Sequence, residues 1–314
     1  MNIAVLNDCY LNEEHLERLR RLGSLTVYDD TDSESGCIER LKGVEIAIVD
    51  GFKTTLSAKV IESSDALRLL VIPSTAFNIV DLDAASRKGL KVANVPGFST
   101  EAVAEHAIAL MFAVIKGIPL GDREVRKTPF EISGTESDER FLGFDVMGKT
   151  LGVIGLGAIG ARVAEIGSAL GMKVVGYNRT PRDVPNVEML GLEALLKASD
   201  VVSVNLALTP ETEYIISDKT LALMKPTAVL INTASGKHVN TQALYKALKE
   251  KKIFGAGLDA LAEWDESNPL LELDNIVLSP HSASWTNEAL ANLAETVTGN
   301  VESFVKGEPR NLVN

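Results

Sequence analysis

The stretch that decides the fold is residues 149–171, KTLGVIGLGAIGARVAEIGSALG. An apolar run is followed by Gly155, Gly157 and Gly160 and then by residues with helical apolar spacing. In a strand, loop and helix of this kind, the first glycine permits the tight turn. The second lets the backbone approach a pyrophosphate, and the third lets the helix pack on the strand. The helix N-terminus favours an anion. The spacing therefore predicts a dinucleotide site, and a glycine-rich turn without a ligand is the alternative.

Short β-branched runs alternate with amphipathic stretches on both sides of this motif. The runs before it are NIAVL, SLTVY, VEIAIVD, LRLLVI and LKVANV, and those from residue 150 onward are TLGVIG, KVVGY, DVVSVNL, TAVLINT, IFGAGLD and NIVLS. Alternation of this kind is typical of parallel strands joined by crossover helices. We expect an α/β protein with two doubly wound parallel sheets.

Composition excludes several classes of protein. The chain has 314 residues, of which 46% are hydrophobic and 24% charged, so it is neither disordered nor fibrous. Its 31 Lys and Arg against 43 Asp and Glu give a net charge of −12, which disfavours nucleic acid and membrane surfaces as partners. Cys9 and Cys37 have no metal-ligand spacing. With no signal-like N-terminus and no apolar run of about 20 residues, we expect a cytoplasmic protein.

Residues 101–119, EAVAEHAIALMFAVIKGIP, predict a helix that is apolar on nearly every face. Such a helix must be buried. It belongs either to a subunit interface, which would make the protein a homodimer, or to an interdomain core. A polar stretch without clear periodicity follows it, and a final helix is predicted over 287–307.

Asn178 and Arg179 stand at the end of the strand that follows the glycine motif, KVVGYNRT (173–180). An acidic residue at this point would accept hydrogen bonds from the ribose of NAD and repel a 2′-phosphate. A neutral amide beside a guanidinium favours NADP(H). The alternative is NAD(H), with Arg179 in solvent and Asn178 bonded to the ribose.

Six segments resemble the D-isomer-specific 2-hydroxyacid dehydrogenase family, most closely its glyoxylate/hydroxypyruvate reductase branch. They are NVPGFSTEAVAEHAIAL (94–110), GKTLGVIGLGAIG (148–160), LALTPETEYII (206–216), INTASG (231–236), GAGLDAL (255–261) and NIVLSPHSAS (275–284). The resemblance implies a Rossmann dinucleotide domain (99–286) inserted in a flavodoxin-like substrate domain (1–98 plus 287–314). It also implies hydride transfer between a nicotinamide and a small 2-oxo acid in the cleft between them.

The resemblance also implies the site residues. His281 is the acid/base, a task that suits imidazole because its ordinary pKa is about 6.5. The family's carboxylate position falls on Trp264, between Glu263 and Asp265. Because this segment is about two residues shorter than in the family, Glu263 is the carboxylate expected to orient His281, and an exposed loop glutamate is the alternative. Asp259 matches the aspartate that contacts the nicotinamide carboxamide. The residues implied around the cofactor are Thr100, Gly155, Gly157, Ala158, Ile159, Gly160, Asn178, Arg179, Ala207, Thr212, Thr233, Asp259 and His281.

The chain departs from the family at Ser235, where relatives carry the arginine that clamps the substrate carboxylate. A hydroxyl cannot reproduce a bidentate guanidinium. Three explanations stay open: an inactivating change, a non-standard substrate, or rescue by Lys237, His238 or Lys53. The residues implied around the substrate are Phe52, Lys53, Thr75, Ala76 and Trp285, of which Trp285 is equally compatible with a core position.

Two functions therefore compete. The first is an NADP(H)-preferring reductase of a small 2-oxo acid such as glyoxylate or hydroxypyruvate. The second is a catalytically silent dinucleotide-binding protein, which Ser235 favours and which the retention of His281 disfavours.

Overall fold

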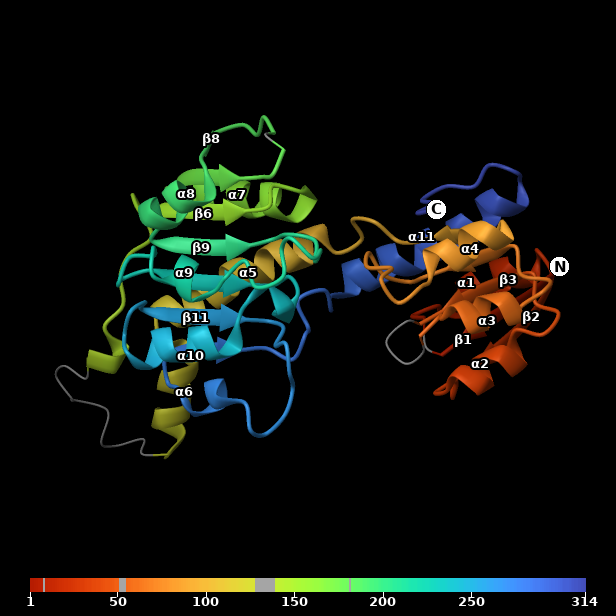
Figure 1. The fold of residues 1–314 in the computed structure, drawn as a ribbon, viewed down its shortest axis with the longest axis horizontal. Helices are drawn as coiled ribbons and strands as arrows, with labels where there is room; N and C mark the ends of the chain where they lie inside the picture. The colour runs from red at the N-terminus through yellow and green to blue at the C-terminus, as the bar shows by residue number, and fades with distance from the viewer. Residues whose placement is uncertain (8, 51–54, 128–138, 181) are drawn as a thin grey trace. The chain divides into compact units, whose positions relative to one another are not determined.

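The computed structural model describes residues 1–314 except 8, 51–54, 128–138 and 181. The chain forms two compact units, one of residues 1–99 with 285–314 and one of residues 100–284. These limits lie one or two residues from the expected domain boundaries. Figure 1 shows each unit as a sheet with helices on its faces.

Unit 1 (1–99 with 285–314) contains a five-stranded parallel sheet. Its strands are β1 (Asn2–Leu6), β2 (Ser24–Tyr28), β3 (Ile46–Val49), β4 (Leu69–Val71) and β5 (Lys91–Ala93). The strand order is β2-β1-β3-β4-β5, which is the flavodoxin-like order. The prediction of a flavodoxin-like sheet is confirmed.

The helices of unit 1 are divided between the two faces of its sheet. On one face, buried apolar residues of α2 (Glu34–Arg40), α3 (Ala58–Ser63) and α4 (Leu82–Lys88) form a common core. On the other, α1 (Glu13–Arg20) packs with the C-terminal helix α11 (Asn287–Val305). Arg18 of α1 joins them by donating to Glu295 at 2.6 Å and to Glu302 at 2.9 Å. The last helix of the chain therefore completes the core of the first unit.

Unit 2 (100–284) contains a seven-stranded parallel sheet. Its strands are β6 (Thr150–Ile154), β7 (Lys173–Tyr177), β8 (Val187–Met189), β9 (Val201–Val204), β10 (Val229–Asn232), β11 (Gly255–Leu258) and β12 (Ile276–Leu278). The strand order is β12-β11-β10-β9-β6-β7-β8. From β6 the chain adds β7 and β8 on one side and then β9 to β12 on the other, as in a Rossmann fold. The predicted fold class is therefore confirmed. The edge strand β8 was not predicted, because VEM offers only three residues and alternation that short is not distinctive.

The two faces of this sheet are covered by different helices. Helices α5 (Thr100–Ile115) and α7 (Ala158–Ala169) share one core cluster with β6 and β10. Helices α8 (Leu192–Ala198), α9 (Asp218–Leu221) and α10 (Thr241–Lys249) share the other. Strands covered on both faces are apolar throughout, which explains their unbroken β-branched runs.

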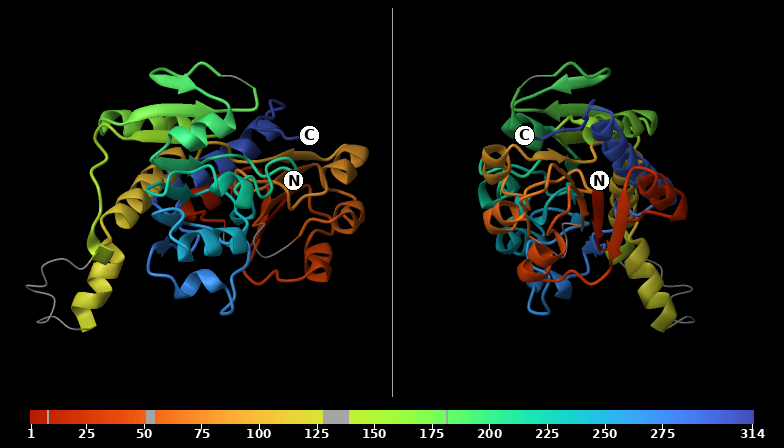
Figure 2. Two further views of the ribbon diagram at one scale, coloured as in Figure 1. Left: turned by 60° about the vertical axis from the view of Figure 1, so that its left-hand side comes forward. Right: turned by 90° about the vertical axis from the view of Figure 1, so that its right-hand side faces the viewer.

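The helix predicted over 101–119 is wrong as a single element. It ends at Ile115, and α6 (Ile118–Lys127) follows at an angle of 55°. Gly117 lies at the break with φ +59°, a conformation that glycine adopts easily, and Pro119 cannot continue the hydrogen bonding of the helix before it. Figure 2 shows α6, in yellow, running away from the rest of unit 2.

Half of α5 is buried inside unit 2. Its buried residues pack on α7 and on β10, β11 and β12. Ala109 is exposed, and Ile108, Phe112 and Ala113 are half-buried. Packing within unit 2 therefore accounts for the buried residues of the helix, and the subunit interface stays a prediction.

Within the described residues, no single helix is long and apolar enough to cross a membrane. The bent pair α5 and α6 passes that test by length and composition together, and half of α5 is buried in the core of unit 2.

Candidate functional site

The predicted site residues of unit 2 gather at one edge of its sheet because the strands are parallel and in register. Ile154, Val204, Asn232, Leu258 and Leu278 are aligned across β6, β9, β10, β11 and β12. The residues that follow these strand ends are Gly155, Asn205, Thr233, Asp259 and Ser279. The carboxyl edge of a doubly wound sheet, beside its switch point, is where ligands bind in such folds. The sheet therefore brings together residues that are up to 124 positions apart in the sequence.

In the loop between β6 and α7, each of the three glycines meets a different structural requirement. Gly155 has φ +95°, and a side chain there would meet the backbone of Asn205 at 2.8 Å. A Cβ on Gly160 would lie 1.9 Å from the carbonyl oxygen of Gly155. A Cβ on Gly157 would meet nothing within 4 Å. Gly155 and Gly160 are therefore required by the fold itself, whereas Gly157 leaves open space in front of the helix N-terminus.

That open space suits an anion. Gly157 is the N-cap of α7 and gives the helix no side-chain cap. Gly157 and Ala158 are exposed, and Ile159 is half-buried. Uncapped N–H groups and the positive end of the helix dipole then face outward together, which is the arrangement that binds phosphate groups.

A cavity of about 520 Å³ lies beside this loop, at the end of β7. Asn178, Arg179 and Arg182 line one part of it, and Ala207, Thr209, Glu211 and Thr212 line another. Asn178 accepts a hydrogen bond from the Leu156 N–H at 2.8 Å, and Arg182 donates to the Leu156 carbonyl at 3.0 Å. Both side chains are thereby fixed to the glycine loop.

Two guanidinium groups line this cavity. Arg179 and Arg182 are exposed, and Arg179 contributes to holding the pKa of Glu211 below its ordinary range, after hydrogen bonds from Thr209 and from the backbone of Glu211 itself. Arg182 was not predicted from the sequence, although NRTPR (178–182) places a second guanidinium three residues after the first.

The loop over the other side of the cavity, 206–216, is held by its own threonine. Thr212 donates to the Ala207 carbonyl at 2.9 Å and accepts from the Thr209 N–H at 2.8 Å. Ala207 is exposed and Thr212 half-buried. Thr212 therefore shapes the loop that the sequence assigns to the cofactor.

Three neighbouring residues at this edge bury polar atoms that have no hydrogen-bond partner in the described part of the chain. They are Oδ1 of Asn205, Oγ1 of Thr233 and the two ring nitrogens of His238. An unsatisfied buried polar group costs about 1–3 kcal/mol. Orphan groups on Asn205 and Thr233, together with the open space at Gly157, fit a polar cofactor such as a nicotinamide dinucleotide along the carboxyl edge.

Ser235 follows β10 in a loop that Asn232 organises. The Asn232 side chain donates to the Ser235 carbonyl at 3.0 Å and accepts from the Ala234 N–H at 3.1 Å. Ser235 caps the short turn η2 (Gly236–His238), its Oγ accepting from the Lys237 N–H at 3.3 Å. The half-buried hydroxyl is thus committed in part to its own turn.

His238 cannot replace the missing arginine. Its side chain is fully buried, and burial lowers its pKa more than the nearby backbone of Ala207 and Ser235 raises it. The ring is therefore neutral near pH 7 and supplies no positive charge. Lys237 is exposed on the same turn, and Lys53 lies outside the described residues.

His281 lies in a loop that Asp259 holds. Its N–H donates to the Asp259 carbonyl at 2.9 Å, and its φ is +56°. The Asp259 carboxylate, 1% exposed, accepts from the Ser282 and Ala283 N–H groups at 2.9 Å each. The imidazole of His281 is exposed. Asp259 therefore fixes the backbone of the predicted acid/base and of the two residues that follow it.

The remaining predicted residues belong to separate segments of the two units. Glu263 is exposed in the loop after β11, and its carbonyl accepts from Asn268 at 3.0 Å. Thr100 begins α5. In unit 1, Thr75 and Ala76 are exposed after β4, and Thr75 donates to the Val95 carbonyl at 3.1 Å.

The last three predicted substrate residues have different outcomes. Trp285 is 63% exposed, so the alternative of a core tryptophan is wrong. Phe52 and Lys53 lie outside the described residues.

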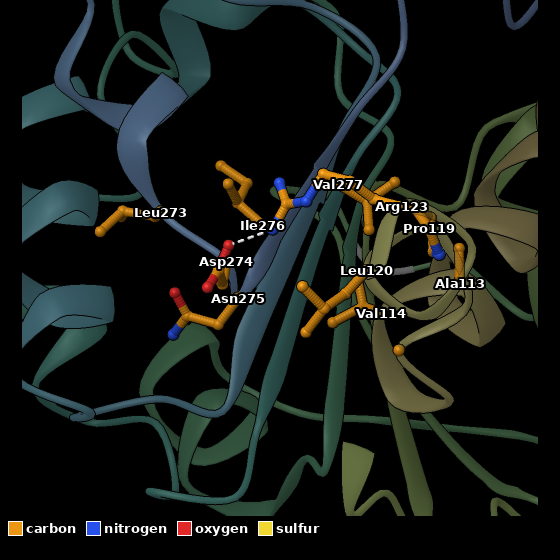
Figure 3. A pocket seen from close by; sticks show the side chains of 11 residues that line it. Ala113, Val114, Pro119, Leu120, Arg123, Leu273, Asp274, Asn275, Ile276 and Val277 are labelled. Atoms are coloured by element: carbon orange, nitrogen blue, oxygen red, sulfur yellow. Dashed lines mark hydrogen bonds and ion pairs between the residues drawn. The ribbon is translucent and has the colours of Figure 1, made fainter. Parts of the chain in front are cut away.

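A second, smaller cavity of unit 2 lies at the N-terminal end of β12, the end opposite Ser279 (Figure 3). Its volume is about 80 Å³, and Arg123 of α6 pairs across it with Asp274. It has room for only a few water molecules. The Arg123–Asp274 pair therefore anchors α6, and the cavity is too small for a dinucleotide.

Residues 108–283 match the family model described as D-isomer specific 2-hydroxyacid dehydrogenase, NAD binding domain. The chain is 38% identical over 311 residues to a glyoxylate reductase of Korarchaeum cryptofilum, covering 96% of this chain and 91% of that protein. It is 39% identical over 284 residues to a glyoxylate reductase of Pyrococcus furiosus, covering 88% and 84% respectively. A solved acyclic imino acid reductase in complex with NADPH and D-Arg superimposes with a TM-score of 0.92 at 36% identity, covering both chains completely.

These matches confirm the resemblance that the six sequence motifs carried, including its glyoxylate reductase branch. They span both units of the chain. The chain belongs to the D-isomer specific 2-hydroxyacid dehydrogenase family and is an NAD(P)-dependent oxidoreductase.

Proposed function

We propose that this protein is an NADP(H)-dependent reductase of a small 2-oxo acid such as glyoxylate or hydroxypyruvate. The observation that carries the proposal is the carboxyl edge of unit 2, where the His281 loop, fixed by Asp259, shares an edge with the open glycine loop. The two glyoxylate reductases similar over most of the chain support the substrate class.

The cofactor preference rests on the cavity at the end of β7. Arg179 and Arg182 line it, and the residue at the strand end is the neutral Asn178. A 2′-phosphate would gain charge-assisted hydrogen bonds from guanidinium groups there. Glu211, on the other wall, is the group that opposes this preference. A bound nicotinamide would supply the hydride.

His281 would give a proton to the substrate oxygen as negative charge develops on it. Imidazole suits this task near neutral pH, and the exposed ring is accessible to a substrate. Glu263 is proposed as the carboxylate that favours the protonated imidazole. Phe52, Lys53, Thr75, Ala76 and Trp285 remain the proposed substrate residues.

The test is oxidation of NADPH, followed by absorbance, with a panel of 2-oxo acids. Turnover of glyoxylate or hydroxypyruvate with a lower KM for NADPH than for NADH is the expected result. Tight NADPH binding without turnover of any acid would instead establish the silent dinucleotide-binding protein.

Ser235 favours a second substrate class, the 2-imino acids. A protonated imine already carries positive charge on its nitrogen, so it needs no guanidinium to polarise the C=N bond and would be repelled by one. Hydride addition to that carbon gives the neutral amine without a proton transfer in the same step. The similar imino acid reductase bound to NADPH and D-Arg supports this reading.

A matched pair of assays separates the two classes. Glyoxylate or pyruvate is supplied with NADPH in the presence and absence of ammonium or methylamine at pH 8–9, where imine forms from these amines. An imine reductase requires the amine and yields an amino acid, whereas a 2-oxo acid reductase yields the hydroxy acid in both reactions.

We also propose a homodimer, on grounds other than α5. Side chains of Ile118 and Val125 on α6 are 59% and 47% exposed, and Leu142 and Met147 are 73% and 79% exposed. Ile118 and Val125 are seven positions apart and so share one face of α6, and an exposed apolar helix face favours a protein partner. Light scattering is expected to give about twice 33.7 kDa, and the mass of one chain at micromolar concentration would refute the dimer.

A further inference from the structure

His106 of α5 is a histidine to which the proposed reaction assigns no role. Its Nε2 lies 2.8 Å from Oγ of Ser279, and Oγ of Ser279 lies 2.6 Å from Oδ1 of Asp259. Nε2 of His106 is also 3.4 Å from the same carboxylate oxygen. All three residues belong to unit 2, and the chain of contacts ends on the aspartate that holds the His281 loop.

The direction of these hydrogen bonds can be deduced. The Ser279 hydroxyl donates its single proton to the carboxylate oxygen of Asp259. Ser279 therefore offers only lone pairs to His106, and Nε2 of His106 must carry a proton. The ring is fixed as a donor by the contacts around it.

The carboxylate that receives this chain is crowded with donors. It accepts from the Ser279 hydroxyl and from the Ser282 and Ala283 N–H groups, and its side chain is almost completely buried. A buried carboxylate is tolerated because such bonds are charge-assisted. Each donor therefore contributes to fixing the orientation of the Asp259 carboxylate.

The loop needs this support because His281 has a left-handed backbone. A non-glycine residue at φ +56° is less stable than in the right-handed region, because its Cβ crowds the backbone. Three hydrogen bonds to Asp259 hold residues 281–283 in that shape, one through its carbonyl and two through its carboxylate. Ser279 stands at the start of the same loop.

We propose that His106 is a positioning residue for the acid/base His281, acting through Ser279 and Asp259. The proposal rests on the proposed function, because it assumes that His281 transfers the proton. His106 itself does not take part in the proton transfer. Its N–H fixes the Ser279 hydroxyl, whose hydrogen bond to Asp259 helps to orient the carboxylate that holds the backbone around His281.

The test compares His106→Leu, which removes the donor, with His106→Gln, whose amide nitrogen reaches a similar point and donates. His106→Leu is expected to lower kcat about tenfold while KM for the 2-oxo acid changes less than about twofold. His106→Gln should retain at least about a third of the wild-type kcat. Glu105→Gln, on an exposed neighbour in α5, is the matched control and should leave kcat unchanged.

A double-mutant cycle with Ser279→Ala tests the route of the effect. If His106 acts through Ser279, the double variant is no slower than Ser279→Ala alone. Additive losses, or equal kcat for His106→Leu and wild type, would overturn the proposal. Equal losses in His106→Leu and His106→Gln would also overturn it, because only packing would then matter.

A measurement on the cofactor-free protein separates this proposal from the proposed function. The chain has four histidines, so their ring signals can be assigned in long-range ¹H–¹⁵N NMR spectra by substitution. We expect His106 in the Nε2–H form, and a shift of the His281 signals in His106→Leu but not in Glu105→Gln. An Nδ1–H form or unmoved His281 signals would refute the positioning role. Absence of turnover in wild type would refute only the proposed function.

Discussion

The glycine loop after β6 and the Ser235 loop after β10 stand at the same sheet edge but are held by different means. Backbone sterics shape the first, since no side chain fits at Gly155 or Gly160. Side-chain hydrogen bonds shape the second, through Asn232 and Ser235. A loop shaped by backbone sterics tolerates few substitutions. A loop shaped by side-chain hydrogen bonds can take other side chains that make equivalent bonds. The glycine loop is therefore fixed by the fold, whereas the Ser235 loop, the proposed substrate half of the site, is adaptable.

The largest expected effects separate two glycines of the same loop. Gly160→Ala should destabilise unit 2 by about 3 kcal/mol or more, because its Cβ would lie 1.9 Å from a backbone oxygen. Gly157→Ala should keep the wild-type urea midpoint, since its Cβ meets nothing. It should raise the Kd for NADPH at least about tenfold by occupying the space in front of the helix.

Denaturation and fluorescence titration measure the two quantities. A destabilised Gly157→Ala would mean that this glycine, too, serves the fold. Unchanged NADPH binding would mean that the dinucleotide lies elsewhere.

The next effect concerns the adaptable loop. If the missing guanidinium is the only defect toward 2-oxo acids, Ser235→Arg should raise kcat/KM for glyoxylate or hydroxypyruvate at least about tenfold, equivalent to about 1.4 kcal/mol. Ser235→Ala is the control, because it removes the same cap of η2 without adding charge. If arginine lowers turnover of 2-oxo acids or acts only on imine reduction, the loop is shaped for the second substrate class.

A smaller effect is expected at the cofactor cavity. Asn178→Asp keeps an oxygen that can accept from Leu156 N–H but adds a charge that repels a 2′-phosphate. The ratio of Kd for NADH to Kd for NADPH should fall about fivefold, the equivalent of about 1 kcal/mol. Asn186→Asp, an exposed residue outside the cavity lining, adds the same charge as a control. An equal fall of this Kd ratio in both variants would mean that the added negative charge, and not its position in the cavity, causes the effect.

The smallest effect is a pH dependence of stability from His238. Because burial lowers its folded-state pKa, the unfolded chain binds the proton more readily. Stability from this group is therefore present above the unfolded pKa and is lost as the pH falls through about 6.5 toward the lower folded value. Urea midpoints at pH 7 and pH 5 should differ less in His238→Leu than in wild type. An identical pH slope would show that other groups dominate.

Much of this protein could be predicted from sequence because its signals are local. A glycine that another backbone segment approaches closely is recognised from the residues next to it. A strand that is buried on both faces is recognised from its unbroken apolar run. Gly155, Gly157, Gly160, Asn178 and Arg179 could be identified in this way. The resemblance to the family then supplied His281 and Asp259, residues that no local pattern distinguishes.

Other features depended on the tertiary structure because their partners are remote in sequence. The contact of His106 with Ser279 joins residues 173 positions apart, and α11 joins the sheet of unit 1 from the far end of the chain. Arg182 is recognised as a lining residue only from the cavity beside β7. The break of α5 at Ile115 reflects the local conformation of Gly117, which the apolar pattern obscured. Sequence by itself determined the fold and the cofactor edge, because their constraints act between near neighbours. Tertiary structure decided which polar side chains meet, because parallel strands bring distant residues to one edge.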